Sequence, residues 1–556
     1  MKIVIIGGVA GGASAAARAR RLSDDAEIIV LERGAYPSFA NCGLPYYVGG
    51  EIQSREKLLV APIAMLRTRH RLDVRVRCEV KSIDRAAKEV TVHDLESDKT
   101  YSESYDKLII ATGASPLRPP IPGIDSSLVL ELRDLKDADR MHSLATSDAK
   151  HAVIVGAGFI GIEVAENLHR RGIEVTIVEL ADQVLPPWDH EMMAPIEDHL
   201  QAQGVNLRLQ DAAAGFVESD SGLQIQLKSG AVIDADFAVV CIGVRPENKL
   251  AVDASITCGD RGGIVTSENM LTCDPDIYAV GDVAQVVDFV TKQPVQIPLA
   301  GPANRQGRIA ADHIFGRSST FRGTQGTAVV GVFGMTAAMT GQSEKLLRRS
   351  ETEFESVYIH PTDHAGYYPG AKQMTLKLLF DPTTGRVLGA QCIGTNGVDK
   401  RIDVIAMAIQ GDMTVYDLEE VELCYAPQYG HAKDAVNMAG FVASGVVRGD
   451  QPIVHETVLE SGLPSNAFVL DVRSAAEFAD GHIAGATNIS IEELRDRLDE
   501  LPRDQKIIAY CKVGQRGYLA TRVLMQNGFD VSNLSGGYLS WCRSSESRNV
   551  DDSIAC

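Results

Sequence analysis

Residues 153–161 read Val153-Ile154-Val155-Gly156-Ala157-Gly158-Phe159-Ile160-Gly161, an apolar run followed by the spacing Gly-x-Gly-x-x-Gly. The run predicts a buried strand, and a helix is expected over Ile162–Arg171. A further strand over Glu174–Val178 leads to Glu179. In such a βαβ unit the glycines let backbone amides approach a pyrophosphate, and the acid accepts a ribose hydroxyl. No arginine follows Glu179 immediately, so the segment predicts NADH rather than NADPH.

A similar unit opens the chain. The expected strand Lys2–Ile6 runs into Gly7-Gly8-Val9-Ala10-Gly11-Gly12, and a helix is expected over Ala13–Leu22. Val9 stands where the fingerprint has its middle glycine, so the match is incomplete. A strand over Glu27–Leu31 nevertheless ends at Glu32, 20 residues after Gly12. We therefore predict a second dinucleotide site here.

Length and composition exclude several classes of protein. At 556 residues the chain is long enough for three or four domains of roughly 150 residues each. A net charge of −20 argues against a nucleic-acid partner, which needs clustered Lys and Arg. No apolar run approaches the roughly 20 residues of a membrane span. The 10 cysteines form no CxxC pair and no metal-ligand spacing, so we expect no metal, reduced thiols and a cytoplasmic location.

Two more strand–turn motifs occur in the chain, and with the two nucleotide units they form an ordered set of four motifs. Tyr105–Ala114 predicts a strand and a tight small-residue turn, and Ile277–Val283 predicts a strand that ends in Gly281-Asp282 before a helix. With the two nucleotide units, these stretches resemble the flavin-dependent pyridine nucleotide–disulfide oxidoreductases over about residues 1–445. The resemblance implies FAD at the first unit, NADH at the second and the flavin ribitol at Asp282. A helix N-cap would be a more ordinary role for that aspartate.

The resemblance also implies which motif positions contact the two cofactors. They are Gly7, Gly8, Ala10, Gly11, Glu32, Arg33, Ala111, Thr112, Gly113, Gly281, Asp282, Gly156, Gly158, Phe159, Ile160, Gly161, Glu179 and Gly243.

One cysteine lies between the two units, in Ser38-Phe39-Ala40-Asn41-Cys42-Gly43-Leu44-Pro45. Most members of the family carry Cys-x-x-x-x-Cys here, but the next cysteine of this chain is Cys78. A lone thiol stores oxidation as a sulfenate or as a mixed disulfide. Lone cysteines are commonly small buried apolar residues, yet this pattern is similar to the single-cysteine subgroup, above all to the CoA-disulfide reductases.

That subgroup implies a CoA site and two assisting tyrosines. Arg18 and Arg21 lie three residues apart on one helix face, which a solvated face would also explain. Tyr367 and Tyr425 match tyrosines that the partner subunit brings to the nucleophile, where a phenol can hydrogen-bond a thiolate or supply a proton. Packing at a dimer interface would explain the same tyrosines. The implied CoA contacts are Ser14, Arg18, Arg21, Ser38, Asn41, Asn304 and Lys433.

The chain ends in a second sulfur-handling pattern. After a connector over Gly445–Pro464, an expected strand Phe468–Val472 is followed by a strand Ile507–Tyr510 that leads to Cys511. A short loop then closes at Arg516 before a helix expected over Gly517–Asn527. The segment resembles a complete rhodanese domain. Backbone amides at a helix N-terminus, together with Arg516, favour a thiolate or persulfide anion on Cys511.

The predicted fold class is α/β in a homodimer. It comprises an FAD-binding domain (1–115 and 245–320) and an NAD(H)-binding domain (116–244), both Rossmann-like, an α+β dimerisation domain (321–450, with strands 374–380 and 387–393 and a helix 401–410), and an α/β rhodanese domain (455–545). The predicted function is NADH-dependent reduction of CoA disulfide, CoA persulfide or polysulfide through FAD and Cys42, with sulfur carried by Cys511. An NADH oxidase or peroxidase with a cysteine sulfenate, and a redox-responsive sulfur carrier or sensor, remain alternatives.

Overall fold

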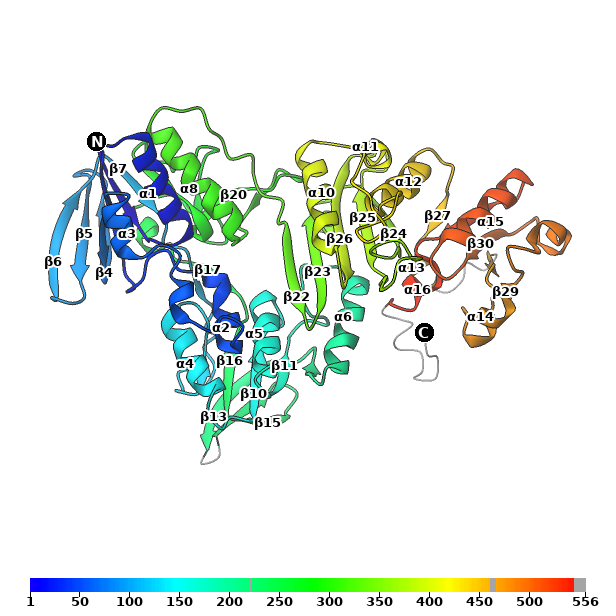
Figure 1. The fold of residues 1–556 in the computed structure, drawn as a ribbon, viewed down its shortest axis with the longest axis horizontal. Coiled ribbons are helices and arrows are strands. Elements are labelled where there is room, and N and C mark those ends of the chain that lie inside the picture. The colour runs from blue at the N-terminus through cyan, green and yellow to red at the C-terminus, as the bar shows by residue number, and fades with distance from the viewer. Residues whose placement is uncertain (220–221, 461–466, 545–556) are drawn as a thin grey trace. The chain divides into compact units, whose positions relative to one another are not determined.

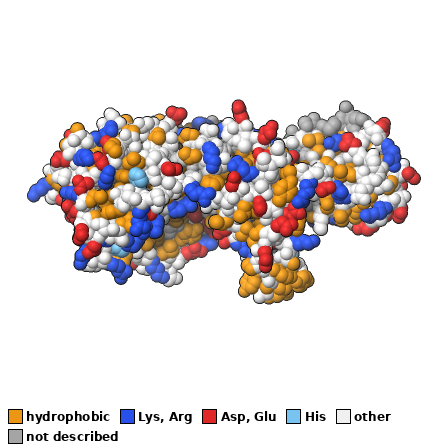
Figure 2. All heavy atoms as spheres, turned by 90° about the horizontal axis from the view of Figure 1, so that it is seen from above, with side chains coloured by type: hydrophobic (Ala, Val, Ile, Leu, Met, Phe, Trp, Pro, Cys, Tyr) orange, Lys and Arg blue, Asp and Glu red, His pale blue; other side chains and the backbone are white. Residues whose placement is uncertain are grey.

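The computed structural model describes residues 1–219, 222–460 and 467–544 (Figure 1). These residues group into two compact units. The first comprises Met1–Asp182 and Gly204–Thr324, and the second comprises Gln183–Gln203 and the described chain from Gln325 onward. None of the described helices is both long and apolar enough to cross a bilayer. On the face shown in Figure 2, basic and acidic side chains are interspersed rather than gathered by sign.

The first unit begins with a five-stranded parallel sheet. Its strands run in the order β19 (Ile277–Ala279), β7 (Lys107–Ile110), β1 (Lys2–Ile6), β2 (Glu27–Glu32) and β3 (Asp73–Val76). Helices α1 (Ala10–Leu22) and α8 (Ala300–Ile314) lie side by side on it, and their alanines join the core (Figure 1). The antiparallel strands β4 (Cys78–Asp84), β5 (Glu89–Asp94) and β6 (Lys99–Ser104) form a small sheet, of which β4 and β5 share a separate core with β1. Parallel strands covered in this way have buried faces, which their apolar runs reflect.

The same unit contains a second parallel sheet. The order is β12 (Asn206–Arg208), β11 (Glu174–Val178), β10 (His151–Val155), β16 (Phe237–Val240) and β9 (Val129–Leu130). Helix α5 (Phe159–His169) follows β10, and the antiparallel strands β13 (Ala213–Ser219), β14 (Gly222–Leu227) and β15 (Val232–Ala235) share a core with this sheet. Both predicted Rossmann-like units are therefore present.

The helices of both units begin three residues earlier than predicted. Gly7 and Gly156 have φ of +98° and +107°, so the chain turns at once and α1 begins at Ala10 and α5 at Phe159. A Cβ on Gly12 would lie 1.9 Å from the Gly7 carbonyl oxygen, so this tight turn needs a glycine there.

The helix predicted after Asp282 is wrong. The structure has a single 3₁₀ turn, Gly281–Val283, followed by strand β20 (Ala284–Val287). Strand pairing determines the conformation of this segment, because β20 is hydrogen-bonded to β18 (Ile264–Val265) and to β21 (Pro294–Val295).

The second unit contains two sheets. An antiparallel sheet has the order β22 (Ala328–Val332), β23 (Met335–Gly341), β26 (Val387–Gly394), β25 (Thr375–Phe380) and β24 (Glu355–Ile359). Helix α10 (Val398–Gln410) packs on β23 and β26, and α12 (Ala435–Val447) packs on β24 and β25. The predicted strands 374–380 and 387–393 are confirmed within a residue, and the helix predicted over 401–410 begins three residues earlier.

The last sheet is parallel, in the order β27 (Ile453–Val454), β31 (Val531–Leu534), β30 (Lys506–Tyr510), β28 (Ala467–Asp471) and β29 (Thr487–Asn488). Helices α14 (Ala475–Asp480), α15 (Gln515–Gln526) and α16 (Gly537–Trp541) belong to this part of the chain. The segment Gly445–Pro464, predicted to be a connector, contains regular secondary structure. It starts inside α12 and contains β27 and helix α13 (Thr457–Glu460), while residues 461–464 lie outside the described residues.

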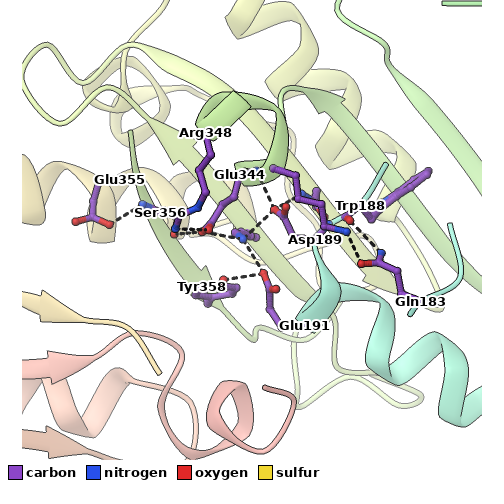
Figure 3. A network of polar contacts seen from close by, with 12 residues as sticks. Gln183, Trp188, Asp189, Glu191, Glu344, Arg348, Glu355, Ser356 and Tyr358 are labelled. Atoms are coloured by element: carbon purple, nitrogen blue, oxygen red, sulfur yellow. Dashed lines mark hydrogen bonds and ion pairs between the residues drawn. The ribbon is translucent and has the colours of Figure 1, made fainter. Parts of the chain in front are cut away.

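Residues 183–203, which the sequence assigned to the NAD(H)-binding domain, group with the second unit. They carry helix α6 (His190–Ala202), and a buried ion network ties them to the antiparallel sheet (Figure 3). The Lys377 ammonium, 1% exposed on β25, lies 2.9 Å from Asp189, 2.6 Å from Glu191 and 3.0 Å from Glu344. A buried lysine of this kind needs its carboxylate partners, so α6 stays with the sheet.

Candidate active sites

A cavity of about 1370 Å³ opens in the first unit at the carboxyl ends of β1, β2 and β7. Ligands of open α/β sheets bind at this end of the strands. The volume exceeds the roughly 300–1,000 Å³ of a typical ligand pocket, which leaves room for a dinucleotide and a second ligand. Many predicted positions line it, namely Gly7, Ala10, Gly11, Ser14, Arg21, Glu32, Arg33, Ser38, Asn41, Cys42, Ala111, Thr112, Gly113, Gly281, Asp282 and Asn304.

Two carboxylates in this region suit the hydroxyls of FAD. Glu32 ends β2, and its oxygens accept the amide hydrogens of Gly8 at 2.8 Å and Gly34 at 2.7 Å. Burial raises the pKa of the Asp282 carboxyl, and the charge of Arg133 only partly opposes it. A half-buried carboxylate that faces a cavity gains by accepting ligand hydroxyls. The glycine turn, Glu32 and Asp282 therefore fit the pyrophosphate, ribose and ribityl parts of FAD.

Cys42 lies in a 3₁₀ turn, Asn41–Gly43, which leads into helix α2 (Leu44–Gly49), and it lines the same cavity. Desolvation by the surrounding chain raises the pKa of its thiol, and the negative charges of Glu163 and Asp282 raise it further. Tyr46 donates a hydrogen bond to Glu163 at 3.1 Å. Since nucleophilic cysteines need a stabilised thiolate, Cys42 requires a hydrogen-bond donor or positive charge beyond these neighbours.

The predicted CoA contacts divide into two groups. Ser14 Oγ lies 2.5 Å from Asn304 Oδ1, and both residues line the cavity with Arg21. Arg18 does not line it, because its guanidinium pairs with Asp312 at 2.6 Å. The predicted contact of Arg18 with CoA needs a side chain that faces the cavity, whereas the Arg18 side chain is bound to Asp312. The last predicted contact, Lys433, is exposed and lies in the second unit.

Arg308 and His70 also line the cavity, and sequence reasoning gave neither of them a role. Arg308 had a usable signal, since it follows Asn304 by four residues on α8 and so shares its helix face. His70 had none, because it lies outside every motif.

The second nucleotide unit repeats the arrangement of the first. Glu179, directly after β11, accepts the amide hydrogens of Ala157 at 2.7 Å and Ala181 at 2.8 Å. Gly158 is the N-cap of α5, so Phe159 and Ile160 begin the helix, and a Cβ on Gly161 would lie 2.0 Å from the Gly156 carbonyl. Gly243 has φ +118°. A 2′-phosphate at this strand end would meet the carboxylate of Glu179.

Tyr367 and Tyr425, which come from separate loops, are brought together in the second unit. Their phenol oxygens lie 2.8 Å apart, and their side chains are 77% and 47% exposed. The hydrogen bond between Tyr367 and Tyr425 raises the pKa of Tyr367. A pair of exposed aromatic side chains is typical of an interaction surface, so the two phenols can serve a site on another subunit.

Cys511 directly follows β30 and is 1% exposed. Helix α15 begins four residues later, with Gly514 (φ +92°) as its N-cap, so Cys511 lies just before a helix N-terminus, where backbone amides favour an anion. Arg516 donates to both oxygens of Glu477, at 2.6 and 2.8 Å, and its guanidinium interacts electrostatically with Cys511. These bonds lower the pKa of Glu477 to about 2. The sequence motif contained Glu477 but gave it no role.

Comparison with known proteins agrees with this organisation. The pyridine nucleotide-disulphide oxidoreductase model matches residues 1–307, the dimerisation-domain model of the same family matches 327–435, and the rhodanese-like domain model matches 456–544. A coenzyme A disulfide reductase of Staphylococcus epidermidis is 35% identical over 444 residues, which cover 80% of this chain and 99% of that protein.

Two solved structures are similar over nearly the whole chain. A reduced CoADR-RHD of Bacillus anthracis is 46% identical, with a TM-score of 0.96 over 98% of both chains. A NAD-dependent persulfide reductase from A. fulgidus is 37% identical, with a TM-score of 0.90 over 97% of this chain and 100% of that one.

Proposed function

The chain belongs to the pyridine nucleotide-disulphide oxidoreductase family, and we propose that it reduces the sulfur–sulfur bonds of CoA disulfide and CoA persulfide with electrons from NADH. Its rhodanese-like domain carries sulfane sulfur on Cys511. The observation that carries the proposal is that Cys42 lines one cavity together with Ser14, Arg21 and Asn304. FAD, when bound, supplies the two-electron chemistry between a nicotinamide and a thiol.

Cys42 is the residue that meets the substrate sulfur. Its thiolate attacks one sulfur of CoA disulfide, forms a mixed disulfide with CoA and releases one CoA thiolate. With CoA persulfide, attack on the inner sulfur releases sulfide and leaves the same mixed disulfide. Two electrons and one proton then return the second CoA as a thiol and Cys42 as a thiolate. NADH and one further proton balance the overall conversion of CoA persulfide to CoA and hydrogen sulfide.

The protein works as a homodimer in this proposal, and Tyr367 and Tyr425 serve the Cys42 of the other subunit. Their hydroxyls stabilise the Cys42 thiolate, which Glu163 and Asp282 oppose, and protonate the departing CoA sulfur. The exposed, hydrogen-bonded phenols support this assignment.

The rhodanese-like domain supplies sulfur in a separate reaction. The Cys511 thiolate attacks the outer sulfur of a donor, forms the persulfide Cys511–S–S⁻ and releases the remainder of the donor as an anion. Loop amides and Arg516 stabilise both charges. The persulfide sulfur then passes to CoA, so that CoA persulfide reaches Cys42.

A lone thiol such as Cys42 also suits the sulfenate of an NADH oxidase or peroxidase. Oxygen consumption by the protein with NADH in air discriminates that reaction, and steady turnover on a CoA substrate dismisses a sensor role. We also propose a cytoplasmic location, which rests on the exposed free thiols of Cys42, Cys273 and Cys424.

The test is to incubate the purified protein with CoA disulfide, denature it and weigh the peptide that contains Cys42. The proposal expects the added mass of one CoA, removable by a reductant. Cys42→Ser should retain FAD yet lose NADH-dependent CoA disulfide reduction, because a hydroxyl cannot form the mixed disulfide. A wild-type peptide without CoA, or a fully active variant, would contradict it.

A further inference from the structure

Residues 535–540, which we call the docking turn, contact both the loop of residues 511–516, here called the catalytic loop, and the antiparallel sheet that contains β24. On one side, the Tyr538 amide donates to the Cys511 carbonyl at 2.8 Å, and the Leu539 amide donates to the Lys512 carbonyl at 2.9 Å. A Cβ on Gly537 would lie 2.3 Å from that Cys511 oxygen. The docking turn is therefore packed tightly against the start of the catalytic loop.

These two hydrogen bonds set the direction of the loop amides. In a trans peptide the C=O and the following N–H point in opposite directions. Since the carbonyls of Cys511 and Lys512 point to the docking turn, the amides of Lys512 and Val513 point away from it. Donors held in this way stabilise an anion without reorganising when the charge forms. The docking turn thus fixes the direction of two loop amides that follow Cys511.

The other side of the docking turn contacts β24 and the residue that follows it. The Tyr358 amide donates to Ser535 Oγ at 3.4 Å, and His360 Nε2 lies 3.0 Å from Ser540 Oγ. A Cβ on Gly536 would lie 2.9 Å from the Tyr358 Cβ. His360, Ser535 and Ser540 are 7%, 4% and 3% exposed, so the contact excludes water.

His360 is the polar centre of this contact. Burial lowers its pKa to about 3, the charge of Arg543 acts in the same direction, and its contact with the Gly536 backbone opposes them only in part. The ring is therefore neutral and carries one proton. Its Nδ1 lies 2.9 Å from Thr375 Oγ1, which accepts a hydrogen bond from Arg543 at 2.8 Å. The Thr375 hydroxyl can then donate to Nδ1, which leaves the ring proton on Nε2 for Ser540.

We propose that His360, a residue of the dimerisation domain, is a positioning residue for Cys511. Its hydrogen bond with Ser540 fixes the position of the docking turn. The docking turn then fixes the carbonyls of Cys511 and Lys512 through its own two amide hydrogen bonds. This inference rests on the proposed sulfur transfer at Cys511. Its consequence is that the rhodanese-like domain reaches full reactivity only when docked on β24.

The decisive variants are His360→Leu and His360→Gln in the full-length holoenzyme. Leucine fills the space without hydrogen bonds, whereas glutamine keeps a donor near the position of Nε2. Loss of one such bond, worth roughly 1 kcal/mol, should lower kcat/KM for thiosulfate-to-cyanide sulfur transfer about fivefold. The loss should fall on kcat, and glutamine should restore most of it.

A second readout does not depend on sulfur transfer. Iodoacetamide alkylation of the Cys511 peptide is followed by mass spectrometry across pH. His360→Leu should move the midpoint to higher pH, because loosened amides stabilise the thiolate less. A wild type without sulfur transfer would overturn the proposed function, while the alkylation profiles would still decide the role of His360.

His455→Gln is the matched control. His455 directly follows β27 and contacts Glu355 of the same β24 at 2.7 Å, but it lies outside the docking turn. Its substitution should leave the Cys511 alkylation profile unchanged, and NADH-dependent CoA disulfide reduction checks that each variant is folded. Unaltered sulfur transfer and alkylation in His360→Leu, or an equal shift in His455→Gln, would overturn the positioning role.

Discussion

The phenol oxygens of Tyr367 and Tyr425 share one hydrogen bond of 2.8 Å on an exposed surface. A bond between two hydroxyls uses one proton, so the other hydroxyl keeps a proton that it can donate to a third group. The bond raises the pKa of Tyr367, so that phenol keeps its proton to a higher pH than an ordinary tyrosine does. In the proposed reaction, this pair protonates the CoA thiolate that leaves the mixed disulfide with Cys42 of the other subunit.

Tyr367→Phe and Tyr425→Phe should each lower kcat for CoA disulfide reduction by about a hundredfold, the usual size of a general-acid contribution. Rapid mixing with NADH should show unchanged flavin reduction, since the phenols act after it. Tyr429→Phe is the control, because Tyr429 is also exposed (66%) and loses only its hydroxyl. Wild-type turnover in both variants would remove the tyrosines from the reaction.

Glu179 should decide the choice of nicotinamide nucleotide. Its carboxylate is fixed by the amides of Ala157 and Ala181, so it cannot turn away from a 2′-phosphate without losing both hydrogen bonds. NADH should be preferred over NADPH in kcat/KM, and Glu179→Gln should narrow the ratio about tenfold. Glu174→Gln, at the opposite end of β11, should not change it. Comparable wild-type values for the two nucleotides would refute this assignment.

Glu477→Gln should weaken sulfur transfer without touching the reductase reaction. The variant leaves Arg516 without its charged anchor, so the guanidinium beside Cys511 becomes mobile. We expect kcat/KM for thiosulfate-to-cyanide transfer to fall about tenfold. Glu493→Gln, which removes the 3.0 Å ion pair with Arg497, is the control. An unchanged rate in Glu477→Gln would show that Arg516 needs no anchor.

His360 should make stability depend on pH. Its folded-state pKa of about 3 lies below the ordinary 6.5, so the unfolded chain binds more protons between these values. The contribution is complete above pH 6.5 and is lost as pH falls toward 3. Urea unfolding should show wild type losing about 1.4 kcal/mol more than His360→Leu between pH 7.5 and 5.5. Equal losses in the two proteins would show that His360 is not held neutral.

Sequence reasoning succeeded where a signal is local. Glycine spacing and an acid at the next strand end depend on neighbouring residues, so both nucleotide units could be predicted. The starts of α1 and α5 could not, because the sharp turns at Gly7 and Gly156 depend on backbone geometry. The strand after Asp282 was missed because its pairing partners decide its structure.

Long-range ion pairs account for the other differences. The partner of Arg18 is Asp312, which lies far along the chain. The sequence around Arg18 therefore gives no sign of this ion pair, and Arg18 was predicted to contact CoA. Likewise, nothing near Lys377 in the sequence indicates that Asp189 will meet it and draw α6 into the second unit. Such pairs form only once the fold exists.

The most direct test of the account measures sulfide release from CoA persulfide and from polysulfide, and turnover of CoA disulfide, in parallel for wild type, Cys42→Ser and Cys511→Ser. Cys42→Ser should lose all three NADH-dependent reactions and keep sulfur transfer. Cys511→Ser should lose sulfur transfer, reduce polysulfide more slowly and retain CoA disulfide reduction, because that route does not include Cys511. NADH-dependent reduction by Cys42→Ser above a few per cent of wild type, or equal loss of all reactions in Cys511→Ser, would contradict the account.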